Sequence, residues 1–498
     1  MSKEYLRPGV FVEEIPSGAF PIEGVGTSTA GFIGIATRGQ LNKAMLVTNW
    51  SQFTKHFGGY RRDSFLAYAV YGFFLNKGSR CYVVRVASSS ADIAAVELDD
   101  RGSGNGGNPT LNVQALNEGE WGNDLSIDIA DGTDLPATEF AITVKEQGEV
   151  VESWDNLAMD GTKENYVEHV INGNSNYIQV TDLDSPSTPP DDRPAIQADT
   201  PLAGGADGIS DIADSDYSGN PADKTGLFAL DEVDEVNTLS IPGVATQAAV
   251  SALSAYCAGR GDCGFVPDCP EGQNPEDTKA FRQQFDTSYG YYYYPRIKIN
   301  DPLSKTVQVI PASGHIIGVF GRNDGERGVH KAPANEIVLG AVGLEYTVTN
   351  GEQEILNPAG VNCIRAFRGR GIRIWGARTM SSDPNLRYVH KRRFLMFVEE
   401  SIADGTQWAP FEPNNPVLWG KIIRSAGAFL KRQWLEGALY GETPEEAYYV
   451  KCDEETNPPE VRQAGQVITE IGVNIVETAE FVIFRIGQWD GGKSITEA

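Results

Sequence analysis

The clearest periodic pattern lies between Pro416 and Tyr440, where apolar residues recur at helical spacing. Pro416 suits a first helical turn and Gly441 suits a stop, so the pattern predicts one long helix. At about 100° per residue, four basic residues share an arc of about 100°, namely Lys421, Arg424, Lys431 and Arg432. The other side carries Leu418, Trp419, Ile422, Ile423, Ala426, Phe429, Leu430 and Trp434, while Leu435 is the one apolar residue inside the basic stripe. This pattern is typical of a solvated surface helix, and it also suits a ridge that docks on an acidic surface.

Strand-like patterns follow this helix. They predict strands at Ala447–Cys452 and Gln466–Asn474 around a Pro-rich, acidic turn, and a third strand at Glu480–Trp489. The third strand either folds back as an ordinary final strand or pairs with another chain, because an open apolar edge recruits partners. Near the N-terminus, two prolines bracket a short strand at Gly9–Ile15 with little sequence before it to pair with. We therefore interpret both ends of the chain as candidate arms.

Residues 29–87 show a compact β-α-β pattern. The predicted strands are Gly31–Ala36, Met45–Thr48 and Arg80–Ala87, and the predicted helices are Ser51–Phe57 and Ser64–Asn76. A unit of this size needs further elements to cover both faces of its sheet.

Residues 227–345 alternate short apolar strands with helices. Strands are predicted near Leu227, Leu239, Cys263, Tyr289 and Val307, and helices at Thr246–Ala258, Pro275–Phe285 and Ser313–Phe320. Such alternation indicates a parallel α/β domain. The run Tyr291–Tyr294 is interpreted as one strand with both faces covered rather than as a stacking platform.

Residues 91–220 are strongly acidic, with 27 Asp and Glu against 4 Lys and Arg. Alternating patterns at Leu125–Ile129 and Phe140–Val144 predict strands, and Asp184–Pro194 is a Pro-rich loop. We predict a small β-rich domain with a solvated acidic exterior. Solubility alone explains such charge, and mutual repulsion that spaces neighbouring copies is the alternative.

Charge is distributed unevenly along the chain. The formal charge of the 498 residues is −27, yet residues 361–440 carry 13 Lys and Arg against 6 Asp and Glu. A concentrated basic field suits an acidic partner. No apolar run approaches about 18 residues, and residues 1–19 carry charges where a secretory signal needs an apolar segment. We therefore expect assembly in a cytoplasm and no direct insertion into a membrane.

Candidate chemistry is sparse. The sequence has no GxSxG motif, and Ser28 in GTSTA precedes every histidine and opens a strand, so no catalytic role is expected. His315 and His330 are isolated, and the six cysteines fit neither a disulfide framework nor zinc-ligand spacing. We expect no enzyme activity, no metal and no cofactor. An α/β hydrolase-like enzyme and a basic-patch nucleic-acid binder are the alternatives that the domain pattern and the basic region leave open.

Several motifs together resemble a known family. PGVFVEEIPSG near the N-terminus is followed by PIEGVGTSTAGFIGIATRG (Pro21–Gly39) and by WSQFTKHFGG (Trp50–Gly59). Towards the C-terminus stand CIRAFRGRGIRIWGARTM and EFVIFRI. These motifs, in about the first 90 and the last 140 residues, resemble the sheath subunit of contractile phage tails and related injection systems.

The resemblance implies a multidomain α/β (α+β mixed) fold in which both chain ends build one inner α+β domain. The N-terminal arm would be residues 1–20, and the inner domain would comprise residues 21–90 and 346–476. The acidic β-rich insertion (91–220) and the parallel-sheet α/β insertion (221–345) would lie between them, with a C-terminal arm at 477–498.

The resemblance also implies a function. The chain would polymerise helically around an inner tube and contract to drive that tube into a target cell envelope, with no enzymatic step. Its partners would be further copies of itself, the tube protein, and baseplate and terminator or cap proteins, with no nucleic acid. The particle, a phage tail or an injection device, would assemble in a bacterial cytoplasm.

Two groups of residues carry the implied contacts. Lys421, Arg424, Lys431 and Arg432 would face the tube. The arms exchanged between subunits would include Gly9, Val10, Phe11 and Val12 at one end and Phe481, Val482, Ile483, Phe484 and Ile486 at the other.

Overall fold

The computed structural model describes residues 21–102 and 107–483. These residues form two compact units. The terminal unit comprises residues 21–25, 330–332 and 394–483, and the central unit comprises the remaining described residues, 26–329 and 333–393. The boundary between Arg393 and Phe394 falls inside helix α9 (Val389–Gly405).

The main sheet of the central unit has five strands in the order β12-β11-β1-β3-β2. They are β12 (Gly264–Phe265), β11 (Thr238–Ser240), β1 (Ala30–Gly34), β3 (Cys81–Arg85) and β2 (Met45–Val47). The first four run parallel and β2 is antiparallel to β3. All five residues of β1 are buried, as expected for a parallel strand that is covered on both faces.

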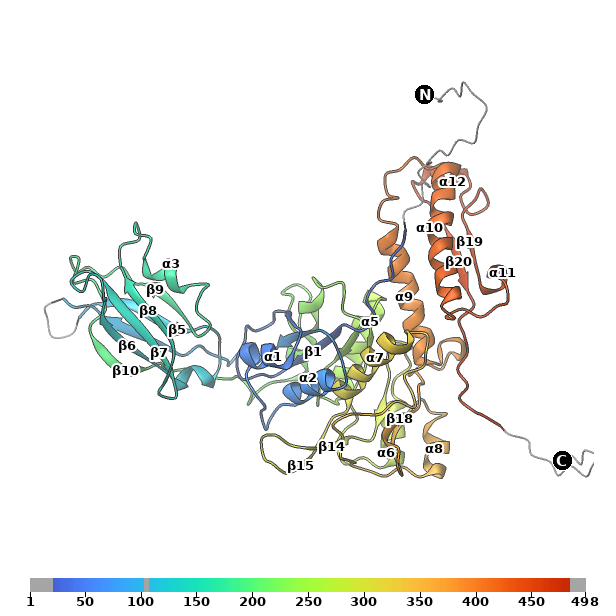
Figure 1. The fold of residues 1–498 in the computed structure, drawn as a ribbon, viewed down its shortest axis with the longest axis horizontal. Helices are drawn as coiled ribbons and strands as arrows, with labels where there is room; N and C mark the ends of the chain where they lie inside the picture. Colours follow the sequence, from blue (N-terminus) through green and yellow to red (C-terminus); the bar gives the residue numbers. More distant parts are fainter. Residues whose placement is uncertain (1–20, 103–106, 484–498) are drawn as a thin grey trace, which may run out of the picture. The chain divides into compact units, whose positions relative to one another are not determined.

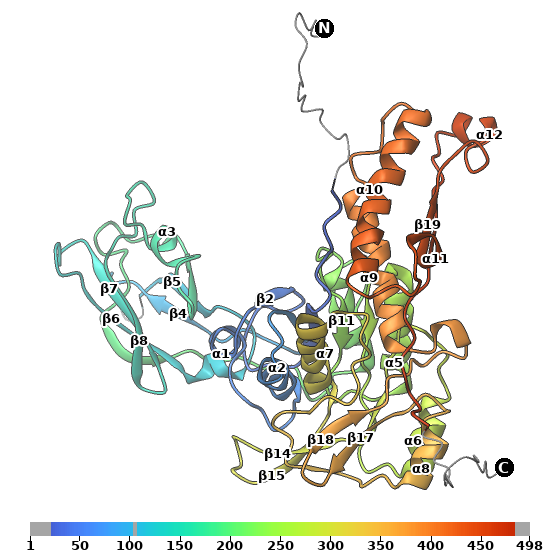
Figure 2. The ribbon, with the colours of Figure 1, turned by 45° about the vertical axis from the view of Figure 1, so that its right-hand side comes forward.

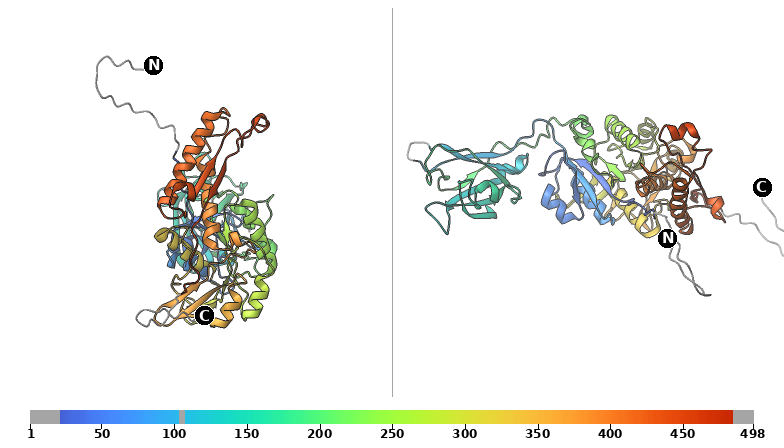
Figure 3. Two further views of the ribbon diagram at one scale, coloured as in Figure 1. Left: turned by 90° about the vertical axis from the view of Figure 1, so that its right-hand side faces the viewer. Right: turned by 90° about the horizontal axis from the view of Figure 1, so that it is seen from above.

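Helices cover both faces of this sheet, as the view from above in Figure 3 shows. Phe32 of β1 packs in a core with α1 (Trp50–Phe57), α2 (Leu66–Leu75) and α7 (Ser313–Arg327). The next residue, Ile33, packs in a second core with α5 (Gln247–Arg260) and α6 (Pro275–Arg282). Alternation of side chains along the strand thus divides the apolar residues between two layers.

The tyrosine run continues the same two-sided pattern. Tyr291 and Tyr293 belong to the first core, and Tyr292 and Tyr294 belong to the second. All four side chains are buried, so the interpretation of one strand with two covered faces is confirmed. Within this run β13 (Tyr293–Tyr294) pairs parallel with β17 (Asn362–Phe367), which pairs antiparallel with β18 (Gly371–Trp375).

Smaller elements complete the α/β part of the central unit. An antiparallel sheet joins β14 (Ile297–Asn300), β15 (Val307–Ile310) and β16 (Gly343–Leu344). The remaining short helices are α4 (Asp214–Ser218), η2 (Gly226–Leu230), α8 (Asn350–Leu356) and η3 (Pro384–Leu386). The strand predicted near Leu227 is therefore wrong, because this apolar run is the turn of 3-10 helix η2. Val307 does start a strand, but that strand is antiparallel.

The acidic residues 91–220 contain two antiparallel sheets, which Figure 1 shows in teal. One sheet has the order β4 (Ala95–Asp99), β5 (Pro109–Ala115), β9 (Ile178–Asp182), and the other β10 (Gln197–Pro201), β6 (Leu125–Asp131), β7 (Phe140–Glu146), β8 (Glu149–Leu157). Helices η1 (Glu120–Asp124) and α3 (Val167–Ile171) flank them. Their apolar cluster lies entirely between residues 93 and 202, so these two sheets share a core of their own.

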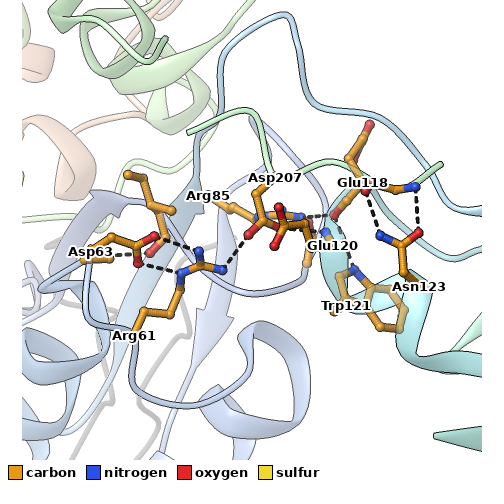
Figure 4. A network of polar contacts seen from close by, with 12 residues as sticks. Arg61, Asp63, Arg85, Glu118, Glu120, Trp121, Asn123 and Asp207 are labelled. Carbon is orange, nitrogen blue, oxygen red and sulfur yellow. Dashed lines mark hydrogen bonds and ion pairs between the residues drawn. The ribbon is translucent and has the colours of Figure 1, made fainter. Parts of the chain in front are cut away.

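Polar contacts of arginines tie Glu118 and Asp207 of this acidic part to the main sheet (Figure 4). Arg85 at the end of β3 is 1% exposed, and its Nη1 donates to the carbonyls of Gly39 (2.7 Å) and Glu118 (2.8 Å). Burial lowers the pKa of Arg85 to about 10. Arg61 Nη1 lies 2.9 Å from Asp207 Oδ2, and Asp207 Oδ1 accepts the backbone N–H of Glu120 at 2.8 Å. These charged hydrogen bonds hold the Glu118–Glu120 turn and Asp207 to the main sheet.

The terminal unit consists of two long helices and a two-stranded sheet, drawn in orange and red in Figure 2. Phe397 of α9 and Phe429 of α10 (Pro416–Leu435) have ring centroids 5.8 Å apart. Strands β19 (Tyr448–Lys451) and β20 (Glu470–Val473) pair antiparallel, with α11 (Pro444–Ala447) and α12 (Pro459–Gln463) before and between them. Residues 21–25 join this unit through Val25, whose N–H donates to Ser401 Oγ at 3.1 Å.

The mixed α/β class predicted from the sequence is confirmed, with several small sheets. One grouping differs from the expectation. Strands β1 and β3, assigned from the sequence to the inner domain, share the main sheet with β11 and β12, which were assigned to the α/β insertion. The separation of inner domain and insertions within an assembled particle stays a prediction.

Candidate assembly surface

Helix α10 begins and ends where its sequence dictates. The Asn415 side chain accepts the N–H groups of Val417 (2.9 Å) and Leu418 (3.2 Å), and Pro416 occupies the first turn. The helix ends at Leu435, five residues before the predicted end, because Gly437 adopts a φ of 81°. The residues buried along the helix are Leu418, Trp419, Ile422, Ser425, Ala426, Phe429, Leu430 and Gln433.

All four predicted basic residues lie on the side of α10 opposite this buried face. Arg424, Lys431 and Arg432 are exposed, and Lys421 is half-buried with Nζ 5.9 Å from the ring centroid of Trp408. Arg432 also has an internal role, since its Nη2 donates to the carbonyl of Ile22 at 2.7 Å. The structure thus brings the four together, but it ties one of them to the N-terminal segment.

Two exposed apolar residues extend the basic face at its ends. Val417 is 67% exposed and Leu435 is 70% exposed. With Lys421, Arg424, Ala428 and Lys431 they form one stripe at alternating spacings of three and four residues. That spacing is the one at which a helix packs lengthwise against another helix. Sequence reasoning noted Leu435 and missed Val417, although the spacing itself could have revealed it.

The sheet β19-β20 offers edges for further strands. In the part of the chain that the structure describes, this sheet has two strands only. Beyond β20, the N–H of Tyr440 donates to Asn474 O at 2.7 Å and the N–H of Val476 donates to Ala438 O at 3.2 Å. The chain after helix α10 therefore runs antiparallel to residues 474–476 without forming a full third strand.

The predicted arms are described only in part. Phe481, Val482 and Ile483 form no strand and are 68–78% exposed. Phe484 and Ile486 lie outside the described residues, as do Gly9, Val10, Phe11 and Val12. In the described part, three consecutive apolar side chains thus remain uncovered by their own chain.

The residues that the sequence offered for chemistry are Ser28, the histidines and the cysteines, and the structure gives the surroundings of each. Ser28 stands two residues before β1, and His315 is buried in α7. The six cysteines are buried thiols. Within residues 21–102 and 107–483 there is no group of three or more His, Cys, Asp or Glu side chains placed to hold a metal ion. None of the described helices is long and apolar enough to span a membrane.

Comparison with known families decides what kind of protein this is. Residues 216–380 match the family model described as the phage tail sheath protein central domain, and residues 381–488 match the phage tail sheath C-terminal domain. Together these matches cover more than half of the 498 residues. The chain belongs to the phage tail sheath protein family. The sheath family is structural and non-enzymatic, so family membership decides against the hydrolase-like alternative.

Individual relatives agree with this assignment. The sheath protein is 24% identical over 286 residues to the tail sheath protein of Escherichia phage P2, covering 55% of this chain and 69% of that one. Its fold is similar to the sheath complex of an extracellular contractile injection system, PVC, in the contracted state, with a TM-score of 0.60 and 21% identity over 98% of this chain and 99% of that one. The contracted helical sheath of the anti-feeding prophage gives a TM-score of 0.60 with 22% identity, over 97% and 99% of the two chains.

Proposed function

We propose that this sheath protein polymerises into a helical sleeve around an inner tube and that contraction of the sleeve drives the tube into a target cell envelope. The observation that carries the proposal is the exposed basic face of α10, opposite the buried face that fixes the helix in its unit. The similarity in fold to sheaths solved in a contracted state supports it. The sleeve would be a component of a phage tail or an injection particle.

Polymerisation would proceed by strand exchange. The apolar segment at Phe481–Ile483 is uncovered by its own chain, and β19-β20 has edges for further strands. A strand donated from one copy to the next forms a head-to-tail contact that does not close on itself, and such contacts generate helical filaments. The arms would then act as tethers while rigid subunits change from one packing to another during contraction.

Fastening to the tube would use screened charges. An exposed ion pair contributes only about 0–1 kcal/mol, and added salt weakens it further. A tube presents the same acidic contact to every subunit, so the total is large although each contact is weak. Such a fastening orders assembly and still releases during contraction.

The remaining partners follow from this role. Baseplate proteins would start the sleeve at one end, and terminator or cap proteins would stop it at the other. Assembly would take place in a bacterial cytoplasm. The inner domain of the sleeve would hold both chain ends, with the acidic part outermost.

The test is reversal of charge on α10 with Arg432 left intact, because Arg432 also holds the carbonyl of Ile22. We expect the triple variant Lys421→Glu, Arg424→Glu, Lys431→Glu to fold but to fail to coat tubes of the cognate tube protein. The control is Lys55→Glu, Arg368→Glu, Arg462→Glu, three exposed residues on other elements that give the same change in net charge.

Coating is measured by electron microscopy, and folding by circular dichroism and thermal unfolding. The control should coat tubes at wild-type density. Wild-type coating by the α10 variant would show that the helix face is merely solvated. Absence of tubular assemblies from the wild-type chain itself would contradict the sheath role as a whole.

A further inference from the structure

The hairpin of β17 and β18, labelled in Figure 2, is rich in arginine. Residues 363–377 contain four Arg and no Asp or Glu. In the register of the hairpin, Arg365 lies opposite Arg373. The next pair, Ile364 and Ile374, is buried in the core, so the alternation of side chains along a strand turns the two arginines away from it. The hairpin therefore has an apolar inner face and a basic outer face.

Two aromatic rings on the outer face hold arginines in place. The ring centroids of Phe367 and Trp375 are 4.6 Å apart. The guanidinium carbon of Arg370 lies 5.5 Å from the first centroid and 5.8 Å from the second, and that of Arg365 lies 5.7 Å from the Phe367 centroid. A guanidinium stacked on a ring keeps its N–H edge for hydrogen bonds and loses less entropy when a partner binds. We call Arg365, Phe367, Arg370, Arg373 and Trp375 the arginine face.

The three guanidinium groups of the arginine face bond to neutral acceptors. Arg365 Nη1 donates to Gln353 Oε1 at 2.7 Å. Arg370 Nη2 donates to Asn335 Oδ1 at 2.9 Å, and Arg373 Nη1 donates to the Asn335 carbonyl at 2.6 Å. Arg370 is exposed, and the other two are half-buried. These bonds orient the side chains and leave their positive charges in place.

Carboxylates on the neighbouring segments do not neutralise this face. Glu336 lies on the segment that bridges to β18, and Glu352 and Glu354 lie on α8. Within the described residues none of them forms an ion pair with an arginine of the face. Glu352 instead caps α8, since it accepts the N–H of Thr349 at 2.7 Å and its hydroxyl at 2.8 Å. The arginine face thus needs an acidic partner from elsewhere.

The acidic part of the chain contains carboxylates with the opposite need. They lie on α3, at the end of β9 and in the loop that follows it. Thr110 of β5 holds the two chain segments together, because its carbonyl accepts the N–H of Leu183 at 2.9 Å and its hydroxyl donates to the carbonyl of Asp192. No Lys or Arg side chain forms an ion pair with these carboxylates in the part of the chain that the structure describes. We call Glu168, Asp182, Asp184, Asp191 and Asp192 the carboxylate cluster.

The members of the carboxylate cluster repel one another. Burial raises the pKa of Asp182, and the neighbouring Asp184 and Glu168 raise it further. The pKa of Asp192 is raised in the same way, by burial and by other members of the cluster. Arg193 opposes this at Asp192, but its guanidinium is buried and donates to three backbone carbonyls. Cations from outside the acidic part would relieve the repulsion.

We propose that the arginine face binds the carboxylate cluster of a second copy of the sheath protein. Charge complementarity selects this occupant, because the edge of a guanidinium matches the two oxygens of a carboxylate. The contact takes five of the 27 acidic residues between 91 and 220 and leaves the others solvated. The proposal rests on the proposed polymer, in which the arms drive assembly and this contact adds to the stability of the assembled sleeve.

The contact is tested first by exchange of charge in the full-length chain. Arg370→Asp and Asp184→Arg should each raise the lowest protein concentration that gives tubes by about twofold to fivefold, and the two changes together should restore the wild-type value. Arg368→Asp is the control for the hairpin, because Arg368 is exposed at its tip and contacts neither ring. Glu164→Arg, at another exposed carboxylate of the acidic part, is the control for the cluster. Light scattering gives the concentration, and circular dichroism reports the fold.

The occupant is tested by cross-linking with a change that keeps the positive charge. Chains labelled with ¹⁴N and ¹⁵N and carrying Arg370→Lys are mixed, assembled and treated with a carbodiimide, which joins the new amine to an adjacent carboxylate as an amide. Mass spectrometry should find peptide pairs that join a light chain to a heavy one, with the acidic partner among residues 168–192. Arg462→Lys, on α12, is the control and should give no such pairs.

Three results would overturn the contact. They are links to residues 168–192 within one chain only, links to other residues only, and a double exchange that assembles no better than Arg370→Asp alone. Binding of a DNA duplex that Arg370→Asp abolishes, without rescue by Asp184→Arg, would assign the arginine face to nucleic acid instead. Failure of the wild-type chain to form tubes would count against the proposed function, whereas normal tubes without these links would count against this contact alone.

Discussion

His315 shows how one buried residue can make the fold sensitive to acid. It lies in α7, is 2% exposed, and its Nδ1 has no partner within the described residues. Gly72 of α2 makes room for it, because a Cβ there would come within 2.2 Å of the ring. Burial lowers the pKa of His315 to about 4, from an ordinary value of 6.5. The sequence interpretation of an isolated structural histidine agrees with this environment.

The lowered pKa of His315 predicts a specific loss of stability in acid. Between pH 6.5 and 4 the unfolded chain binds a proton that the folded chain does not, so the free energy of unfolding falls as the pH falls. The loss is on the order of 3 kcal/mol once the pH is below both pKa values. We expect His315→Leu to be less sensitive than wild type in this window, as measured by denaturant unfolding at a series of pH values.

The quantity to compare is the difference in free energy of unfolding between wild type and His315→Leu at each pH. The many carboxylates that both proteins share titrate alike and cancel in this difference. His169→Leu is a suitable control, since that histidine is in the acidic part and has no buried, unpaired nitrogen. It should follow the wild-type curve. If His315→Leu and wild type lose stability in parallel, the imidazole is not the group that titrates.

At the scale of elements, the sequence predicted those with strong local signals. Helix α10 follows from its apolar spacing and its proline, and α2 follows from the run Leu66–Leu75. The run at Leu227 was misread because a short apolar run fits a strand or a 3-10 turn equally well, and here the turn buries Leu227 and Leu230. Gly226, with a φ of 57°, starts the turn there.

Long-range pairing was beyond what local patterns could show. β1 pairs with β11 across about two hundred residues, and Arg432 reaches the carbonyl of Ile22 across 410. The sequence of one such segment does not indicate which distant segment it will contact. The sequence therefore predicted which basic residues make up the candidate surface. The hydrogen bond from Arg432 to the carbonyl of Ile22 became visible only in the structure.

The two ends of the chain are expected to pair with neighbouring subunits. Phe481–Ile483 are exposed apolar residues in a segment that makes no strand of its own, so we expect them to add to β19-β20 of a neighbour. Deleting everything after Ala479 should leave a folded, soluble monomer, as should deleting residues 1–18. Sedimentation gives the mass, and circular dichroism reports the fold.

The control for the truncations keeps the length of the chain and changes its strand character. Phe481→Ser, Val482→Ser and Ile483→Ser together should abolish polymerisation as the C-terminal deletion does, whereas replacing Glu477 and Thr478 by Ser should not. Normal polymer from either truncated chain would rule out exchange through that arm.

At the scale of the whole molecule, the acidic part is nearly self-contained. Its apolar core lies within residues 93–202, and the chain enters and leaves it side by side. The N–H of Asp92 donates to Ala206 O at 2.9 Å, and the N–H of Ser88 donates to Gly208 O at 3.0 Å. What joins it to the main sheet is polar, chiefly Arg85 and the pair of Arg61 with Asp207. Water can replace such contacts, whereas it could not replace a shared apolar core.

This arrangement predicts that the acidic part can be removed without loss of the fold. Replacing residues 92–206 by a Gly-Ser linker keeps Asp207 for Arg61 and exposes Arg85, whose bond to the Glu118 carbonyl passes to water. We expect a cooperative thermal transition close to that of the full chain, and tubular polymers by electron microscopy. A shortened chain that cannot fold would show that the boundaries are misplaced.

The same variant decides between the two explanations of the acidic charge. The excision removes 23 Asp and Glu and 4 Lys and Arg, which changes the formal charge from −27 to −8. If the charge spaces neighbouring subunits by repulsion, the full chain needs salt to assemble. Salt shortens the range of the repulsion, which falls to about 10 Å at 0.1 M ionic strength and is longer at lower salt. The shortened chain should then polymerise at lower salt and lower concentration than the full chain, as followed by light scattering. Identical salt dependence of the two proteins would mean that the acidic surface serves solubility alone.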